Sequence, residues 1–148
     1  MTSAVARARQ KKEPKKERGP ALIIRFSDED LWVRGEADHV QVGLSDHGQD
    51  KLGEIIAVDL PEVGNSVERG EPFGELESVR TGLELISPVT GSVTAVNAEL
   101  SDNPSLINED PYHEGWLIEV ALAEESELEE LLGADEYEEL IESDDNDE

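Results

Sequence analysis

The side chains of this chain offer little to an enzyme. Its 148 residues contain no cysteine, three histidines and five lysines. Without cysteine there is no disulfide, no Cys–zinc site and no thiol nucleophile. The sequence contains no recognisable Ser/His/Asp set and no glycine-rich phosphate loop. The acids in the turns at 102–104 and 108–111 lack the ligand spacing of a cation site. We therefore expect neither catalytic residues nor a metal centre.

One side chain is placed where it could act on another molecule. Arg80 begins the tight turn Arg80-Thr81-Gly82, which separates two predicted strands at 73–79 and 83–86. Two strands joined by a short turn predict a β-hairpin. The similar segments 53–58 and 91–96 flank this turn and suggest two related β units in a flattened barrel. A tip held by rigid strands on both sides is suited to presenting one side chain to other proteins.

The remaining elements describe a small, mainly β domain over residues 20–123. A short helix is expected between Ser45, a favourable N-cap, and Gly53, which ends it. We expect Trp32 and Trp116 to pack in the core or in a groove, and His47 to lie near the surface. Further strands are predicted at 21–26, 40–44, 55–60, 93–96 and 116–122, separated by turn residues.

Both ends of the chain differ from this domain in charge. Residues 1–19 carry seven Lys or Arg against two Glu, a net of +5, and almost no large apolar residue. This composition predicts a disordered basic tail that could touch an acidic surface, including the chain's own. Residues 143–148 form an acidic end that we expect to be disordered.

Residues 124–142 predict two C-terminal helices packed on the domain. A capping box runs from Ser126 to Glu129, and Gly133 is placed to end the first helix. The apolar faces of the two helices would consist of Leu128, Leu131 and Leu132, then Tyr137, Leu140 and Ile141.

The overall charge limits the partners. The chain carries 37 Asp or Glu against 12 Lys or Arg, a formal net charge of −25. Such a chain repels nucleic acid and anionic membrane surfaces as a whole. It also has no apolar run long enough to span a bilayer. We expect a soluble, cytoplasmic monomer that binds neither nucleic acid nor membrane.

Several longer motifs are similar to those of one protein family. They are FSDEDLWV (26–33), VGLSDHGQDKLGEI (42–55), DLPEVGNSVERGEPFGELESV (59–79), SPVTGSVTAVN (87–97), LINEDPYHEGWLIEV (106–120) and ELEELLGADEYEELI (127–141). On these motifs the chain resembles the H protein of the glycine cleavage system. The resemblance implies the lipoyl/biotinyl-carrier fold, a flattened barrel (barrel-sandwich hybrid) with short edge helices. Biotin carriers are disfavoured, because methionines flank their attachment lysine and Met1 is the only methionine here.

The resemblance also implies the key position. In the family a lysine follows the motif ESV at the hairpin tip and forms an amide with lipoic acid, and this arm carries an aminomethyl group between the glycine cleavage enzymes. Here the motif is ESVRTG (77–82), so Arg80 stands where the family has lysine. A lysine amine can lose its proton and attack an acyl group, whereas an arginine guanidinium stays protonated and delocalised. Lys51 lies in the predicted helix and the other lysines lie in the basic tail, so we expect no lipoate on this chain.

A groove for the loaded arm is the other feature that the resemblance implies. In the family this groove uses a small hydroxyl residue and a glutamate just before a tryptophan. Glu29 and Leu31 stand at these positions, before Trp32, and Glu84 keeps the family's acidic residue after the hairpin. The arm-groove candidates are therefore Glu29, Leu31, Trp32 and Glu84. The apolar Leu31 fits a chain that has also lost the arm at Arg80.

Three functions remain open. The first is an H-protein homologue without lipoate that acts as a docking or regulatory module for glycine cleavage enzymes or for enzymes that attach lipoate. The second is a conventional H protein that shuttles the aminomethyl group in glycine decarboxylation. The third is a carrier-fold protein with an unrelated binding role, in which the charged tails would matter.

Overall fold

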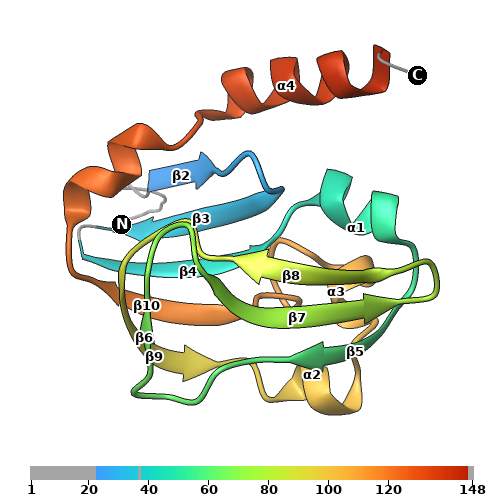
Figure 1. Ribbon diagram of the computed structural model, residues 1–148, viewed down its shortest axis with the longest axis horizontal. Helices are drawn as coiled ribbons and strands as arrows, with labels where there is room; N and C mark the ends of the chain where they lie inside the picture. Colours follow the sequence, from blue (N-terminus) through green and yellow to red (C-terminus); the bar gives the residue numbers. More distant parts are fainter. Residues whose placement is uncertain (1–22, 37, 147–148) are drawn as a thin grey trace, which may run out of the picture.

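The computed structural model describes residues 23–36 and 38–146, which form two antiparallel sheets with short helices at their edges (Figure 1). The larger sheet has six strands in the order β2-β3-β4-β10-β9-β6. The predicted mainly β class is therefore confirmed. The bounds of the six strands are β2 (Ile23–Phe26), β3 (Leu31–Glu36), β4 (His39–Leu44), β10 (Ile118–Leu122), β9 (Gly91–Val96) and β6 (Ser66–Val67).

The smaller sheet carries the hairpin that contains Arg80. β7 (Pro72–Ser78) lies between β5 (Ile55–Asp59) and β8 (Gly82–Ile86). Along the hairpin the buried Leu76 and Leu85 alternate with exposed glutamates. Because successive side chains of a strand point to opposite faces, one face of this sheet is apolar and the other is acidic. The exposed glutamates of the hairpin are Glu75, Glu77 and Glu84.

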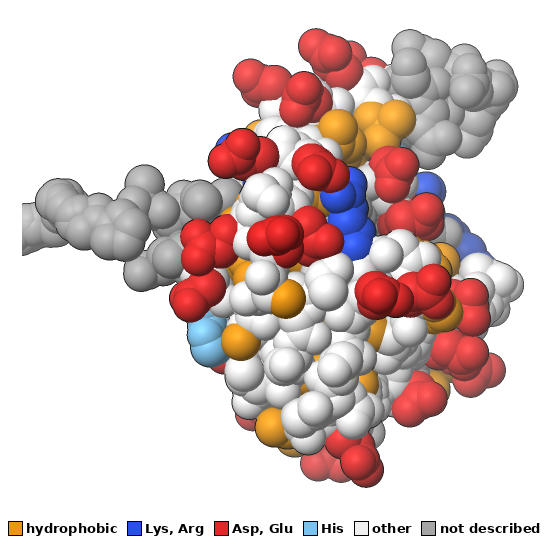
Figure 2. Space-filling model, turned by 60° about the vertical axis from the view of Figure 1, so that its left-hand side comes forward, with side chains coloured by type: hydrophobic (Ala, Val, Ile, Leu, Met, Phe, Trp, Pro, Cys, Tyr) orange, Lys and Arg blue, Asp and Glu red, His pale blue; other side chains and the backbone are white. Residues whose placement is uncertain are grey.

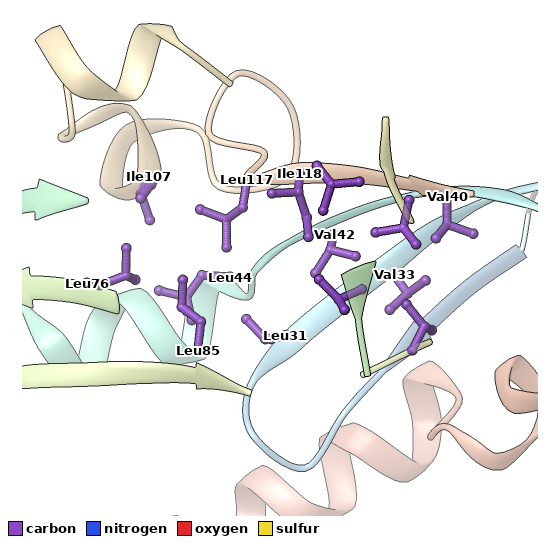
Figure 3. Packing of buried hydrophobic residues seen from close by; sticks show 14 of the residues in the cluster. Leu31, Val33, Val40, Val42, Leu44, Leu76, Leu85, Ile107, Leu117 and Ile118 are labelled. Atoms are coloured by element: carbon purple, nitrogen blue, oxygen red, sulfur yellow. The ribbon is translucent and has the colours of Figure 1, made fainter. Parts of the chain in front are cut away.

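The hydrophobic core lies between the two sheets. Figure 3 shows Leu76 and Leu85 of the small sheet facing Leu44 and Leu117 across this core. Each of these four leucines is at most 2% exposed. Full burial of one such side chain stabilises the fold by about 1.5–3 kcal/mol. The hairpin is therefore held by its inner face, which leaves its tip free to extend beyond the core.

Short helices join the sheets at one end of the molecule. α1 (Asp46–Leu52) begins after Ser45, whose Oγ accepts a hydrogen bond from the Gly48 N–H (3.1 Å). It ends at Gly53, whose φ of 79° is a left-handed conformation that glycine adopts without strain. Both predicted ends of this helix are confirmed. Where the sequence predicted only turns, the structure has two single-turn helices, α2 (Glu99–Asp102) and α3 (Leu106–Glu109).

Four strands depart from the sequence prediction. β3 is absent from the prediction because Leu31, Trp32 and Val33 are all buried, so the alternation of a half-exposed strand is missing. The two-residue strand β6 was not predicted either. β9 begins at Gly91 rather than at residue 93, and β10 begins at Ile118 rather than at Trp116.

The first C-terminal helix is a 3-10 helix, η1 (Glu125–Glu130), and not an α-helix. Its N-cap is Glu124, which makes no side-chain capping bond, so the predicted capping box of Ser126 and Glu129 is wrong. The carboxylate of Glu127 instead accepts hydrogen bonds from the N–H (2.7 Å) and Oγ1 (2.8 Å) of Thr90. These bonds attach η1 to the loop before β9.

The second C-terminal helix is α4 (Ala134–Asn146), which lies over β2 and extends toward α1 (Figure 1). Gly133 precedes this helix and donates its N–H to Glu136 Oε1 (2.9 Å), so it does not end η1 as predicted. The helix also continues past residue 143, where we expected disorder to begin.

The contact of α4 with the domain is narrow. Tyr137 is buried and its ring stacks on Phe26, with 4.5 Å between the ring centroids and 2° between the planes. Leu140 is 40% exposed, although helical spacing predicted it on the same buried face. The prediction is wrong at Leu140 because α4 rests on an edge strand, so fewer of its positions are covered than on a helix that packs across a sheet.

Among the charged side chains on the face of the molecule shown in Figure 2, acidic ones predominate.

Within the described residues, no helix is long and apolar enough to cross a membrane. The basic tail at 1–19 and the last two residues, 147–148, lie outside the part of the chain that the structure describes.

Candidate functional site at the β7–β8 hairpin

Ser78 shapes the tip of the hairpin. Its N–H donates to the Thr81 carbonyl (2.8 Å), which closes the turn around Val79 and Arg80. Its buried Oγ accepts hydrogen bonds from the N–H groups of Arg80 and Thr81, both at 3.1 Å, and donates to the Thr81 carbonyl at 3.0 Å. A serine that satisfies the backbone of its own turn in this way favours one turn conformation. The predicted hairpin, with Arg80 at its tip, is confirmed.

The tip is also attached to the neighbouring strand. The Val79 N–H donates to the Glu54 carbonyl (3.0 Å), one residue before β5 begins. The Val79 side chain is nevertheless 61% exposed, and Arg80 is exposed as well. The backbone of the tip is therefore held on both sides while its side chains face solvent.

The guanidinium of Arg80 binds the C-terminal end of α1. Its Nη1 donates to the carbonyl oxygens of Lys51 (2.8 Å) and Asp50 (3.2 Å). These carbonyls lie in the last turn of the helix, where no later N–H is available within the helix, and a cation there also interacts favourably with the helix dipole. A Cβ atom on Gly53 would lie 3.3 Å from Arg80 Nε, so the side chain passes close over the end of the helix. This contact spans about thirty residues of sequence, and no local pattern predicts it.

Asn108 holds the same end of α1 in place. Its Oδ1 accepts from the Ile55 N–H (2.9 Å), and its Nδ2 donates to the Gly53 carbonyl (2.8 Å) and to Gln49 Oε1 (2.9 Å). One side chain from α3 thus connects α1 with the start of β5. The sequence prediction treated Asn108 as a turn residue and missed this role.

Lys51 lies beside the tip, but its amine is engaged elsewhere. Its Nζ pairs with Asp30 Oδ2 (2.9 Å), and Asp30 Oδ1 accepts a hydrogen bond from the Tyr137 hydroxyl (2.7 Å). Burial raises the pKa of Tyr137 above its ordinary value; the bond with Ser45 lowers it, and the hydrogen bond and charge of Asp30 raise it. The phenol therefore stays protonated and continues to donate to Asp30. As predicted, Lys51 belongs to the helix and not to the tip.

The structure does not bring the four arm-groove candidates together at the surface. Leu31 and Trp32 are each 1% exposed, and Trp32 Nε1 donates to the Pro111 carbonyl (2.9 Å). Glu29 is exposed in the turn between β2 and β3, and Glu84 is exposed on the outer face of β8. An open pocket of about 320 Å³ is lined by Glu29 but by none of the other three.

Arg80 is the charged side chain at the turn of the hairpin. Arg80 supplies a positive charge and hydrogen-bond donors, but no amine that could be acylated. No group of three or more His, Asp or Glu side chains in the described segments is arranged to hold a metal ion.

Comparisons with known proteins agree with this architecture. The family model described as "Glycine cleavage H-protein" matches residues 24–144. The glycine cleavage system H protein of Halalkalibacterium halodurans is 50% identical over 118 residues, which are 80% of this chain and 92% of that protein. The H protein of a Geobacillus species is 48% identical over 118 residues, 80% of this chain and 93% of its own. A crystal structure of a glycine cleavage system H protein from Mycobacterium marinum has a TM-score of 0.74 at 35% identity and covers 80% of this chain and 96% of its own.

The fold, the exposed hairpin and these matches define the class as a small β carrier protein that has no catalytic site of its own. Within that class, the chain belongs to the glycine cleavage H-protein family. The family carries lipoate. The basic tail lies outside the residues that the family model matches.

Proposed function

We propose that this chain is an H-protein homologue that carries no lipoate and acts as a docking or regulatory module. Its partners would be the cytoplasmic enzymes that recognise H proteins, either those of glycine cleavage or those that attach lipoate. The observation that carries the proposal is Arg80 at the exposed tip, with its guanidinium bound to the carbonyls of α1.

The tip does not fit lipoyl attachment. Forming the amide requires a nitrogen that can lose a proton and then attack an activated carboxyl group. The guanidinium of an arginine keeps its proton throughout the physiological pH range and shares its electrons over three nitrogens. Arg80 keeps the charge of the family's lysine and much of its length. An enzyme that binds the hairpin before it acts can therefore bind this chain without completing the reaction.

The surface around the tip supports recognition by a protein. Val79 is exposed beside Arg80, and the outer face of the hairpin carries Glu75, Glu77 and Glu84. Glu75 and Glu84 are direct cross-strand partners, an arrangement of like charges that is unfavourable in the isolated sheet. A partner with a basic surface would relieve this repulsion on binding.

A conventional carrier role is the second candidate, because the chain belongs to a family that carries lipoate and Lys51 lies close to the tip. The Lys51 carbonyl is 2.8 Å from Arg80 Nη1. Its amine, however, is engaged in an ion pair with Asp30 Oδ2 (2.9 Å). Lys51 also projects from a helix, so it is less accessible to an enzyme that receives a hairpin tip.

The first experiment measures the intact mass of the protein after coexpression with lipoate and a lipoate-attaching enzyme. Wild type is compared with Arg80→Lys, Lys51→Arg and the double variant. We expect a lipoyl mass increase in both proteins that carry the Arg80→Lys substitution, whether or not Lys51 is present, and in neither protein that keeps Arg80. Modification of wild type that disappears in Lys51→Arg would replace this proposal with the conventional carrier role.

A second experiment tests docking directly. Wild type is added in molar excess to the lipoylation of a lysine-bearing H protein by the same enzyme. We expect competitive inhibition, which raises KM for the H protein and leaves kcat unchanged. Arg80→Glu is the matched variant, because it reverses the charge at the tip and should weaken the inhibition. An initial rate of lipoylation that stays the same at every concentration of wild type would contradict a docking role toward this enzyme.

A further inference from the structure

A groove between α1 and α4 has an aromatic floor. It encloses about 390 Å³ and is lined by Phe26, Tyr112 and Tyr137. The ring of Tyr137 stacks on Phe26, and the Tyr112 hydroxyl accepts a hydrogen bond from the Asp46 N–H (3.0 Å), which orients that ring. Aromatic faces of this kind attract Lys and Arg side chains through cation–π interactions.

The rim of the groove is acidic. Asp46, Asp50 and Glu138 line it and are exposed, and none of its lining residues is Lys or Arg. The pocket that contains Glu29 differs, because there Arg69 forms an ion pair with Glu130. Carboxylates above an aromatic floor make the α1–α4 groove suitable for a chain segment that carries several positive charges.

The sequence supplies such a segment close to the groove. The seven basic residues of the tail fall between Arg7 and Arg18, shortly before β2 begins at Ile23. Lys16 lies seven residues before Ile23, a distance that extended chain can span to about 23–25 Å. Phe26, in the floor of the groove, lies only three residues beyond Ile23, about 10 Å along the strand. The tail is therefore long enough to turn back and reach the rim.

We propose that the groove between α1 and α4 is the docking site of the chain's own basic tail, residues 7–18. The lysines and arginines of the tail pair with Asp46, Asp50 and Glu138, and some of them lie over the tyrosine rings. The proposal does not depend on whether any residue carries lipoate.

Cross-linking of the full chain tests this proposal. A zero-length carbodiimide joins lysines to carboxylates that are in contact, and mass spectrometry of the peptides locates each link. At low protein concentration we expect the tail lysines, Lys11, Lys12, Lys15 and Lys16, to link several-fold more often to Asp46, Asp50 and Glu138 than to Glu75 and Glu84. Mixing isotopically labelled and unlabelled chains distinguishes links within one molecule from links between two.

Matched variants separate a specific site from general attraction. Asp50→Asn/Glu138→Gln removes two rim charges, and Glu75→Gln/Glu84→Gln removes two charges from the outer face of the small sheet. Because the substituted residues can no longer react, the readout is the link from the tail lysines to Asp46, which we expect the first pair to reduce several-fold and the second pair to leave unchanged. Links spread evenly over the exposed acids, equal effects of the two variants, or links only between molecules would each overturn the proposal.

Removal of residues 1–19 provides an independent readout by NMR. We expect amide shifts in α1 and α4 on truncation that exceed those in β7 and β8. Truncation that leaves α1 and α4 unshifted would overturn the proposal even if cross-links had formed.

Discussion

Replacement of Asn108 by alanine should destabilise the protein more than any other single polar substitution near the tip. The half-buried side chain makes three hydrogen bonds, to the Ile55 N–H, the Gly53 carbonyl and Gln49 Oε1. Two of these partners are backbone groups at the junction between α1 and β5. Asn108→Ala removes all three bonds at once and leaves both backbone groups without their present partner.

The expected loss follows from these bonds. A typical intramolecular hydrogen bond contributes about 0.5–1.5 kcal/mol net, and a buried group left unpaired costs about 1–3 kcal/mol. Because Asn108 is only half-buried, water can reach part of the vacated site, which moderates the second cost. We therefore expect Asn108→Ala to lower the free energy of unfolding by about 2–4 kcal/mol.

Urea unfolding of wild type and variant at neutral pH measures this loss, provided that the slope with denaturant stays the same. Asn103→Ala is the matched control, because Asn103 is exposed and its Oδ1 accepts only a hydrogen bond from Ser105 Oγ (2.8 Å). The control should change stability by less than about 0.5 kcal/mol, as surface substitutions usually do. An Asn108→Ala variant as stable as the control would refute the role assigned to this side chain.

Three further substitutions test other contacts. Burial raises the pKa of Tyr137 in the folded state. The contribution of this group to the free energy of unfolding should therefore be fully present below about pH 10 and fall above it by up to about 1.4 kcal/mol per pH unit. Tyr137→Phe should give a flatter alkaline profile in urea unfolding. Arg80→Ala removes two exposed bonds to α1 and should cost no more than about 1 kcal/mol in the same assay, since the tip backbone is held by Ser78. Glu127→Gln should weaken the attachment of η1 and speed hydrogen exchange at the Thr90 amide, while a rate equal to wild type would contradict this role of Glu127.

Sequence reasoning was most successful where one short segment determines its own conformation. The helix between Ser45 and Gly53 is an example, because a hydroxyl cap and a glycine able to adopt positive φ are local devices. The hairpin around Arg80 is another, since two strand segments and a tight turn are sufficient to predict it. In both cases tertiary packing reinforces a preference that the local sequence already has.

The errors occur where distant residues decide the structure. The predicted capping box of Ser126 and Glu129 does not form, and η1 is attached instead through Glu127, which accepts a hydrogen bond from Thr90, 37 residues earlier. Leu31, Trp32 and Val33 of β3 are all buried, and Trp32 is covered in part by the distant loop residues Pro111 and Tyr112, so β3 lacks the alternation on which strand prediction depends. Leu31 and Trp32 are buried for a reason that the motif could not show, because alignment with a family's motif places residues along the chain without indicating which face becomes covered.

The contact between Arg80 and α1 bears most directly on function. An unattached arginine at a hairpin tip would sample many rotamers, and a partner would have to order it on binding at a cost of up to about 2 kcal/mol. Here the guanidinium is already directed to the carbonyls of Asp50 and Lys51, so part of that ordering is complete before any partner arrives. A partner that binds the tip in this conformation meets a rigid surface formed by the hairpin and the end of α1. An enzyme whose active site receives the family's lysine would have to draw the Arg80 side chain into that site, and it would first have to break both bonds. The same contact therefore favours docking on the folded tip over insertion of Arg80. Arg80→Ala removes both the bonds to α1 and the positive charge. If the bonds limit insertion, this variant should compete more strongly than wild type for an enzyme that draws the tip side chain inward. If the charge is required for binding, the variant should compete more weakly than wild type.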